Sequence, residues 1–94
     1  MKFLVNITIE LPGSMPEAER ADLMARELAR GRELIESGQL VGIWRVPGRR
    51  ANVSLYDVPD ADALHTALSS LPLFPWLDIR VEPLATHPLG ELFA

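Results

Sequence analysis

The apolar and polar residues of this chain follow periods that predict four strands and two helices. Residues 3 to 10 and residues 77 to 82 alternate between apolar and polar positions, which is the period of a half-buried strand. Two further strands are predicted from about Val41 to Val46 and from about Ala51 to Tyr56, with a Pro-Gly-Arg turn between them. The four predicted strands therefore lie at the two ends and in the middle of the chain.

The two helices are predicted between these strands. Ser14 and Glu17 have the spacing of a capping box, so the first helix is expected to begin there and to run to about Ser37. Gly38 supplies the stop that commonly follows a helix. The second helix opens at Pro59-Asp60 and carries leucines at helical spacing.

The resulting order, βαββαβ, predicts the fold. With right-handed crossovers it gives an α+β protein with a four-stranded antiparallel sheet and both helices on one face, the ferredoxin-like arrangement. The 94 residues are read as one domain, 1–94, whose own core is small although 48% of the residues are hydrophobic. We therefore expect a homo-oligomer, in which two uncovered sheet faces pack together as a dimeric α+β barrel.

Composition narrows the classes of function. The chain has no cysteine, which excludes disulfides and thiolate metal sites and fits a cytoplasmic protein. We find neither a signal-peptide core nor an apolar run that could span a bilayer, so no membrane partner is expected. A net charge of −4 with scattered arginines gives little support to nucleic-acid binding. His65 and His87 have no acidic residue at ligand spacing, and we find no phosphate loop, so neither a metal nor a nucleotide cofactor is expected.

Glu27 is the most informative position. At 100° per residue it falls in the middle of the apolar arc of the first helix. The other members of that arc are Leu23, Met24, Leu28, Gly31, Leu34 and Ile35. An ionised carboxylate there must be paired, protonated or facing a cavity, and burial moves its pKa toward neutrality, which suits a general base for carbon acids. The alternative is a structural salt bridge to Arg20 or Arg45.

Two further groups are candidates for binding. Arg45 could bind a substrate carboxylate through paired hydrogen bonds, with Trp44 as an apolar wall. The alternative is that Arg45 is an interface or edge-strand residue and Trp44 belongs to the core. Asn52, Ser54 and Tyr56 form a polar row on the third strand, where they could donate hydrogen bonds to a ligand or oxyanion. Hydrogen bonding across strands or between subunits explains that row equally well.

Short segments along nearly the whole chain carry a family resemblance. They are the opening strand ending in Leu11-Pro12, the Glu27 helix, Trp44-Arg45 followed by Gly48, Ala51-Asn52 with Ser54, Tyr56-Asp57-Val58, Ala63-Leu64-His65, Leu71-Pro72-Leu73-Phe74-Pro75, Asp78-Ile79, Val81 and His87-Pro88. Together they resemble the muconolactone Δ-isomerase family, which includes chloromuconolactone dehalogenases. The resemblance implies a ferredoxin-like subunit that dimerises through its sheets and assembles further, typically to a decamer. It also implies isomerisation of muconolactone to the 3-oxoadipate enol-lactone in aromatic-compound breakdown, without metal or organic cofactor.

The resemblance suggests roles for the candidates. Glu27 would remove a proton from the carboxylated lactone and return it elsewhere on the allylic system. Arg45 would hold the substrate carboxylate, and Asn52, Ser54 or His65 would stabilise the dienolate oxygen.

The chain departs from the family beside the glutamate. Leu28 and Met24 stand where family members usually carry lysines, and Arg49-Arg50 stand where the turn typically has a histidine or an aromatic residue. Losing a nearby cation removes an interaction that lowers the pKa of Glu27, and Arg49 is expected to help bind substrate from the turn. Two alternatives stay open: an isomerase or dehalogenase-type lyase acting on another lactone or enolisable metabolite, and a non-catalytic, barrel-forming binding subunit.

Overall fold

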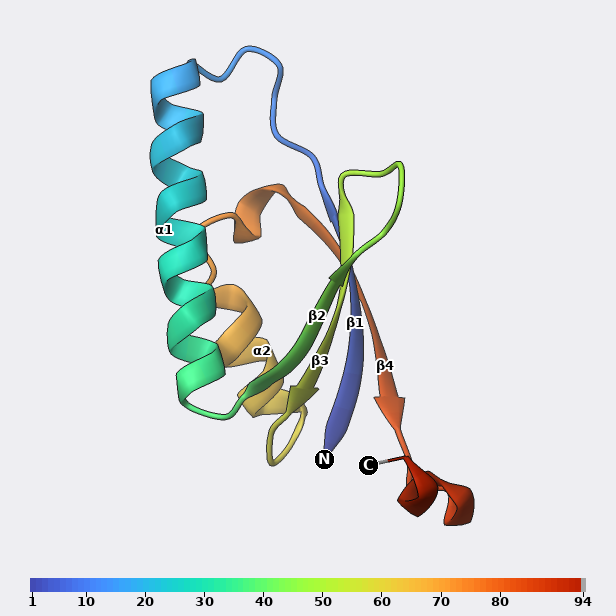
Figure 1. The fold of residues 1–94 in the computed structure, drawn as a ribbon. Coiled ribbons are helices and arrows are strands. Elements are labelled where there is room, and N and C mark those ends of the chain that lie inside the picture. The colour runs from blue at the N-terminus through green and yellow to red at the C-terminus, as the bar shows by residue number, and fades with distance from the viewer. Residues whose placement is uncertain (94) are drawn as a thin grey trace.

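Four antiparallel strands form one sheet in the order β2-β3-β1-β4, and two helices cover one of its faces (Figure 1). The structure, a computed structural model, describes residues 1–93. The elements are β1 Lys2–Ile9, α1 Glu17–Glu36, β2 Leu40–Arg45, β3 Ala51–Asp57, α2 Ala61–Ser69, the 3-10 helix η1 Phe74–Trp76, β4 Leu77–Leu84 and the 3-10 helix η2 Pro88–Leu92. The predicted ferredoxin-like α+β arrangement is confirmed.

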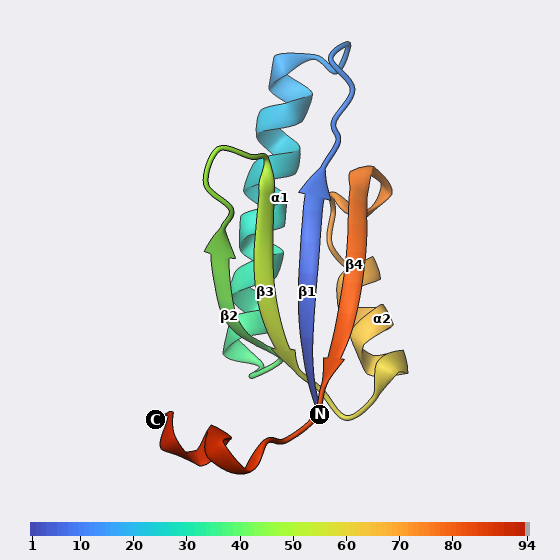
Figure 2. The same cartoon turned by 90° about the vertical axis from the view of Figure 1, so that its right-hand side faces the viewer.

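The helix-covered face of the sheet holds the core. Phe3, Val5 and Ile7 alternate along β1 and are buried, while the residues between them lie on the other face. Their register partners on β3 are Tyr56, Ser54 and Asn52. The polar row predicted on the third strand therefore lies on the same face as the core of β1, beneath the helices. Figure 2 shows the opposite face of the sheet, which neither helix covers.

The capping box predicted at Ser14 is wrong. Helix α1 begins at Glu17, after Pro16, and no side chain caps it. Pro16 has an extended ψ of 142°, so Ser14 precedes the helical backbone by too many residues to serve as its cap. Glu17 and Glu19 instead place negative charge in the first turn, where the helix dipole favours it.

The other helix boundaries agree with the sequence. Gly38 has a φ of 81°, a left-handed backbone conformation that glycine adopts without strain. Its N–H donates a hydrogen bond to Ile35 O at 3.0 Å, which closes the end of α1. Asp60 caps α2 by accepting a hydrogen bond from the Ala63 N–H at 2.8 Å. None of the helices within residues 1–93 has the length and apolar character needed to cross a bilayer.

Helix α1 packs on the sheet at only part of its apolar arc. Leu23 and Leu34 are buried, but Leu28 is 60% exposed and Ile35 is 52% exposed. The exposed members of the arc face the edge strand β2, whose Ile43 is itself 53% exposed. The helix and this edge of the sheet thus stand apart, and the space between them is the candidate site.

Candidate functional site

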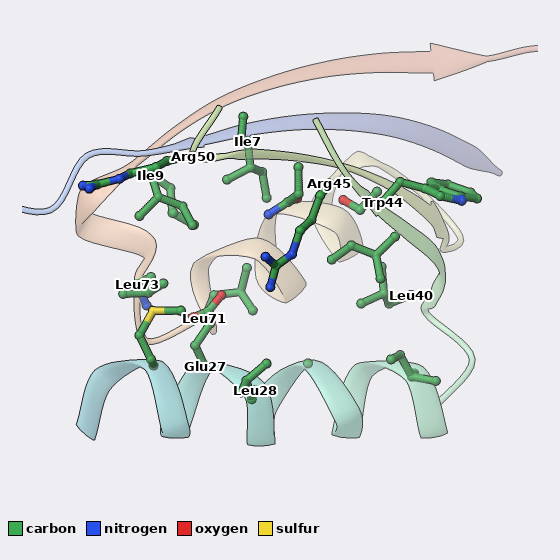
Figure 3. Close-up of a pocket in the computed structure, with 18 of the residues that line it drawn as sticks. Ile7, Ile9, Glu27, Leu28, Leu40, Trp44, Arg45, Arg50, Leu71 and Leu73 are labelled. Carbon is green, nitrogen blue, oxygen red and sulfur yellow. Dashed lines mark hydrogen bonds between the residues drawn. The ribbon is translucent and has the colours of Figure 1, made fainter. Parts of the chain in front are cut away.

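A cavity of about 510 Å³ lies between α1 and the helix-facing side of β2 and β3 (Figure 3). This volume is within the range of roughly 300–1,000 Å³ that is typical of small-molecule sites. Apolar side chains from the helix, the sheet and the segment before β4 make most of the wall. The polar side chains among them are the ones that can carry chemistry.

Most of the site residues predicted from the sequence meet at this cavity. Those that line it are Glu27, Trp44, Arg45, Arg49, Asn52 and Ser54. His65 does not line it: the side chain is exposed on α2, and its ring stands edge-on to Phe74, with 6.3 Å between ring centroids. A catalytic role for His65 stays an untested prediction, and the cavity gives it no support.

Glu27 is held by a backbone group. Its Oε1 accepts a hydrogen bond of 3.0 Å from the Leu73 N–H, which lies in the segment between α2 and β4. Leu71 and Leu73 anchor that segment because both side chains are buried. Two backbone hydrogen bonds hold it further: Phe74 N–H donates to Leu71 O at 2.9 Å, and Trp76 N–H donates to Leu73 O at 2.8 Å. The donor is therefore rigidly placed.

Glu27 is a half-buried acid that forms no ion pair with any group of residues 1–93. Burial raises the pKa of its carboxyl above the ordinary 4.5, and the Leu73 N–H bond opposes that rise. The salt bridge considered from the sequence is not formed. Arg20 donates to Pro12 O at 3.1 Å instead, and the ion pairs within residues 1–93 involve other groups.

Tyr56, which the sequence placed in the polar row of β3 without a role of its own, also lines the cavity. Its side chain is only 2% exposed, and burial together with the negative charge of Glu27 raises the pKa of Tyr56 to about 12, although Arg30 opposes the rise. The hydroxyl is thus neutral over the physiological range and can act as a hydrogen-bond donor. Nothing in the alternation of β3 distinguishes this tyrosine from its neighbours in the polar row.

The other two members of the polar row differ from one another. Ser54 is buried, and its Oγ donates a long bond of 3.5 Å to the Val5 carbonyl on β1. Asn52 Oδ1 is buried and has no hydrogen-bond partner within residues 1–93. Cross-strand hydrogen bonding thus accounts for Ser54. Asn52 Oδ1 is instead a buried acceptor without a partner, which costs stability, and a ligand that donates a hydrogen bond to it would offset that cost.

Positive charge gathers at the cavity of an otherwise acidic chain. Among residues 1–93, Glu27 supplies the one carboxylate that lines the cavity, and four arginines line it: Arg32, Arg45, Arg49 and Arg50. None of these arginines is in an ion pair within residues 1–93. In Figure 3 the guanidinium of Arg45 projects from the sheet into the space above α1. The arrangement favours a small anion placed beside a carboxylate base.

Trp44 contributes to the wall from an unusual position. It stands on β2 opposite Val53, out of phase with Ile43 and Arg45, and is 59% exposed. Its ring crosses Gly42 so closely that a Cβ at that residue would lie 2.6 Å from it. Gly42 therefore gives the indole room to lie along the strand. The predicted contact between Trp44 and substrate is not tested by this geometry.

Comparisons with known proteins agree in pointing to one family. Residues 1–89 match the family model of muconolactone delta-isomerase. A muconolactone delta-isomerase from Cupriavidus pinatubonensis is 47% identical over 88 residues, which cover 94% of this chain and 96% of that protein. One from Pseudomonas aeruginosa is 40% identical, with 94% and 92% covered.

Solved structures show the same likeness. A crystal structure of muconolactone isomerase superposes with a TM-score of 0.89 at 42% identity and covers 94% of this chain and 92% of its own. A 5-chloro-2-hydroxyhydroquinone dehydrochlorinase from Burkholderia phenoliruptrix, in complex with 2,5-dihydroxybenzoquinone, gives a TM-score of 0.68 at 18% identity, with 93% and 96% covered. At that identity the second likeness concerns the fold alone.

Proposed function

The chain belongs to the muconolactone delta-isomerase family, and from this premise we propose that it isomerises muconolactone by proton transfer at Glu27. The observation that carries the assignment is the setting of that carboxylate. Within residues 1–93 it is the one acidic side chain that lines the cavity, and its pKa is raised. The hydrogen bond from the Leu73 N–H fixes Oε1 and leaves Oε2 to meet a substrate.

The reaction needs one base and no exchange of electrons. In muconolactone the ring double bond is conjugated with the lactone carbonyl, so the proton on the ring carbon that bears the carboxymethyl group is acidic. Glu27 takes this proton, and the C–H electron pair moves through the ring to give a dienolate with its charge on the carbonyl oxygen. The Glu27 carboxylic acid then returns the proton to the carbon beside the carbonyl. The double bond has moved and the atoms of the substrate are unchanged.

The raised pKa of Glu27 suits both halves of this cycle. A general base works best when its pKa lies near the operating pH, because it must be ionised in the free enzyme and still bind a carbon-derived proton well. Burial supplies the upward shift of this pKa, and the Leu73 N–H, which favours the ionised form, limits it.

The other polar groups suit binding and charge stabilisation. Arg45 is the candidate clamp for the substrate carboxylate, with Arg49 beside it at the turn. For the dienolate oxygen, the neutral hydroxyl of Tyr56 is the better candidate donor. Asn52 can donate to that oxygen only through its side-chain Nδ2, because its unpartnered Oδ1 is an acceptor. Ser54 is a weaker one, because its hydroxyl hydrogen is directed to the Val5 carbonyl.

A direct assay tests the proposal. Purified protein is mixed with (+)-muconolactone, and the ring protons are followed by NMR. We expect conversion to the enol-lactone with multiple turnovers. A ring-chlorinated muconolactone in a parallel tube distinguishes elimination of chloride from isomerisation. Absence of turnover with muconolactone would contradict the proposed substrate, and chloride release alone would favour a dehalogenase-type lyase.

We further propose that the active form is a homo-oligomer built on a sheet-to-sheet dimer. Leu4, Val53 and Leu55 lie on the face that Figure 2 turns to the viewer and are only half-buried in the single chain. Burying such a face against a second copy removes apolar surface from water. Multi-angle light scattering at micromolar concentration is expected to give a mass of at least two chains, and a stable monomer would contradict the barrel.

A further inference from the structure

The stripe of α1 that faces the core has charged residues at its centre. Four residues spaced by three or four positions lie along this side of the helix: Leu23, Glu27, Arg30 and Leu34. The two leucines are buried, and the two charged residues between them are half-buried. Burying a guanidinium among apolar side chains is costly unless it is hydrogen-bonded, so the partner of Arg30 is informative.

Arg30 and Glu27 bind the same segment, residues 70–76 between α2 and β4. Arg30 Nε donates to Ser70 Oγ at 2.9 Å, and the Leu73 N–H donates to Glu27 Oε1 at 3.0 Å. Within residues 1–93 these are the two hydrogen bonds that join α1 to this segment. Figure 3 shows Glu27 projecting from α1 toward Leu73. Because the bonds are three residues apart on both sides, together they fix how α1 lies against the segment.

Ser70 connects this contact to α2. It is the C-cap residue of α2, and its Oγ donates to Ala67 O at 2.6 Å. A serine hydroxyl has one hydrogen and two acceptor lone pairs, so Oγ can donate to Ala67 and still accept from Arg30. These two bonds tie α1 to the end of α2, where the chain enters the segment that carries the Leu73 N–H.

We propose that Arg30 is a positioning residue for the base: through Ser70 it holds the segment against α1 and so keeps the Leu73 N–H on Glu27 Oε1. The inference rests on the proposed function of Glu27. Buried leucines and backbone bonds fix the segment on the core, but α1 stands away from β2, so its distance from the segment depends on the contacts of the stripe. If the segment moves away, the Leu73 bond weakens. Since that bond lowers the pKa of Glu27, the pKa would rise further.

Other groups act on the Glu27 carboxylate through space. Tyr56 faces it from β3, and the pKa of Tyr56 depends on the charges of both Glu27 and Arg30. Residues 70–76 carry no titratable side chain. The remaining charged groups nearby are the cavity arginines Arg32, Arg45, Arg49 and Arg50, and Glu33 at 3.8 Å from Arg30. Removing Arg30 therefore changes both a bond and a charge, whereas Ser70→Ala removes the bond and leaves every charge in place.

The test is a double-mutant cycle read by the titration of Glu27. Arg30→Met, Ser70→Ala and the double variant are labelled with 13C at the glutamate Cδ, and the Glu27 signal is identified by its loss in Glu27→Gln. The midpoint of this signal is measured together with the pH profile of kcat/KM for muconolactone. Ser69→Ala is the matched control, because the Ser69 hydroxyl bonds carbonyls within α2, at 2.7 Å from His65 O.

We expect the Glu27 midpoint to move to higher pH in Ser70→Ala and in Arg30→Met, and the double variant to match Arg30→Met. Below the midpoint, kcat/KM should fall by roughly 2- to 10-fold, the equivalent of one hydrogen bond. Ser69→Ala should keep the wild-type midpoint. A midpoint that moves in Arg30→Met but not in Ser70→Ala would mean that Arg30 acts through its charge alone, and it would overturn the positioning role. A lower melting temperature of both single variants with an unchanged midpoint would also overturn it.

The titration separates this inference from the proposed function, because it needs no substrate. If the protein does not turn over muconolactone, yet Ser70→Ala raises the Glu27 midpoint, the positioning role stands and the proposed reaction falls. If the protein turns over muconolactone and the midpoint is the same in the wild type and Ser70→Ala, the reaction stands and the positioning role is overturned.

Discussion

Replacing Glu27 with glutamine is expected to lower kcat for muconolactone by roughly 10²- to 10⁴-fold, the usual contribution of a general acid–base group. Glutamine has the same shape and can still accept the Leu73 N–H bond through its amide oxygen, so the cavity should stay intact. It cannot take up the ring proton. Steady-state kinetics by the NMR assay measures the loss. Glu36→Gln, at an exposed position near the end of the same helix, is the matched control and should retain activity.

The pH dependence adds a second readout of the same assignment. Because Glu27 acts as the ionised base, kcat/KM should rise with pH through its raised pKa, at values above 4.5. A shallow profile with no step above pH 4.5 would contradict this. Activity that survives Glu27→Gln would reject Glu27 as the base for any substrate tested.

The stability of the protein should respond to the same group in a defined direction. The folded-state pKa of Glu27 is raised, so between pH 4.5 and that pKa the folded chain keeps a proton that the unfolded chain has lost. The free energy of unfolding contributed by this group therefore falls as the pH rises through that window. Glu27→Gln removes the cost of burying the ion. At neutral pH the melting temperature of the variant should be higher than that of the wild type. This difference in melting temperature should disappear well below pH 4.5.

The fold was predictable because the apolar and polar residues repeat with the periods of strands and helices, and these periods can be read from the sequence alone. The alternation on β1 identified the buried face, since every second side chain of a strand points the same way. Asp60 and Gly38 marked helix ends through local hydrogen bonding and backbone preference. Ser14 did not mark the start of α1, because Pro16 has an extended backbone and the helix begins only after it, at Glu17.

The site was predictable only where a side chain conflicted with its surroundings. Glu27 was identified because an ionised carboxylate on the apolar arc of a helix is costly unless it is paired, protonated or facing a cavity. Its partner could not be found in this way, because the Leu73 donor is a backbone N–H, which every residue except proline carries. The sequence also did not show that α1 stands away from β2, since an apolar arc looks the same whether it packs or lines a cavity. His65 matched the family pattern, but its helix turns it to the surface.

Arg45 provides the second large effect. It is the last residue of β2, exposed in the single chain, and Figure 3 shows its guanidinium directed into the cavity. Arg45→Met keeps much of the length of the side chain and removes the charge and the hydrogen-bond donors. Because hydrogen bonds to charged groups contribute more than neutral ones, we expect kcat/KM for muconolactone to fall by roughly 10- to 100-fold.

The loss should appear mainly in KM. The substrate carboxylate keeps its charge from the bound lactone to the dienolate, so a clamp on it stabilises both states alike and contributes uniform binding. Arg45→Lys should recover only part of the loss, since an ammonium cannot form the paired bonds of a guanidinium. Arg26→Met, on the far side of α1 where Arg26 bonds Asp22 at 3.0 Å, is the control for losing one positive charge. A fall in kcat at constant KM would instead place Arg45 at the dienolate oxygen, because only there does negative charge develop during the reaction.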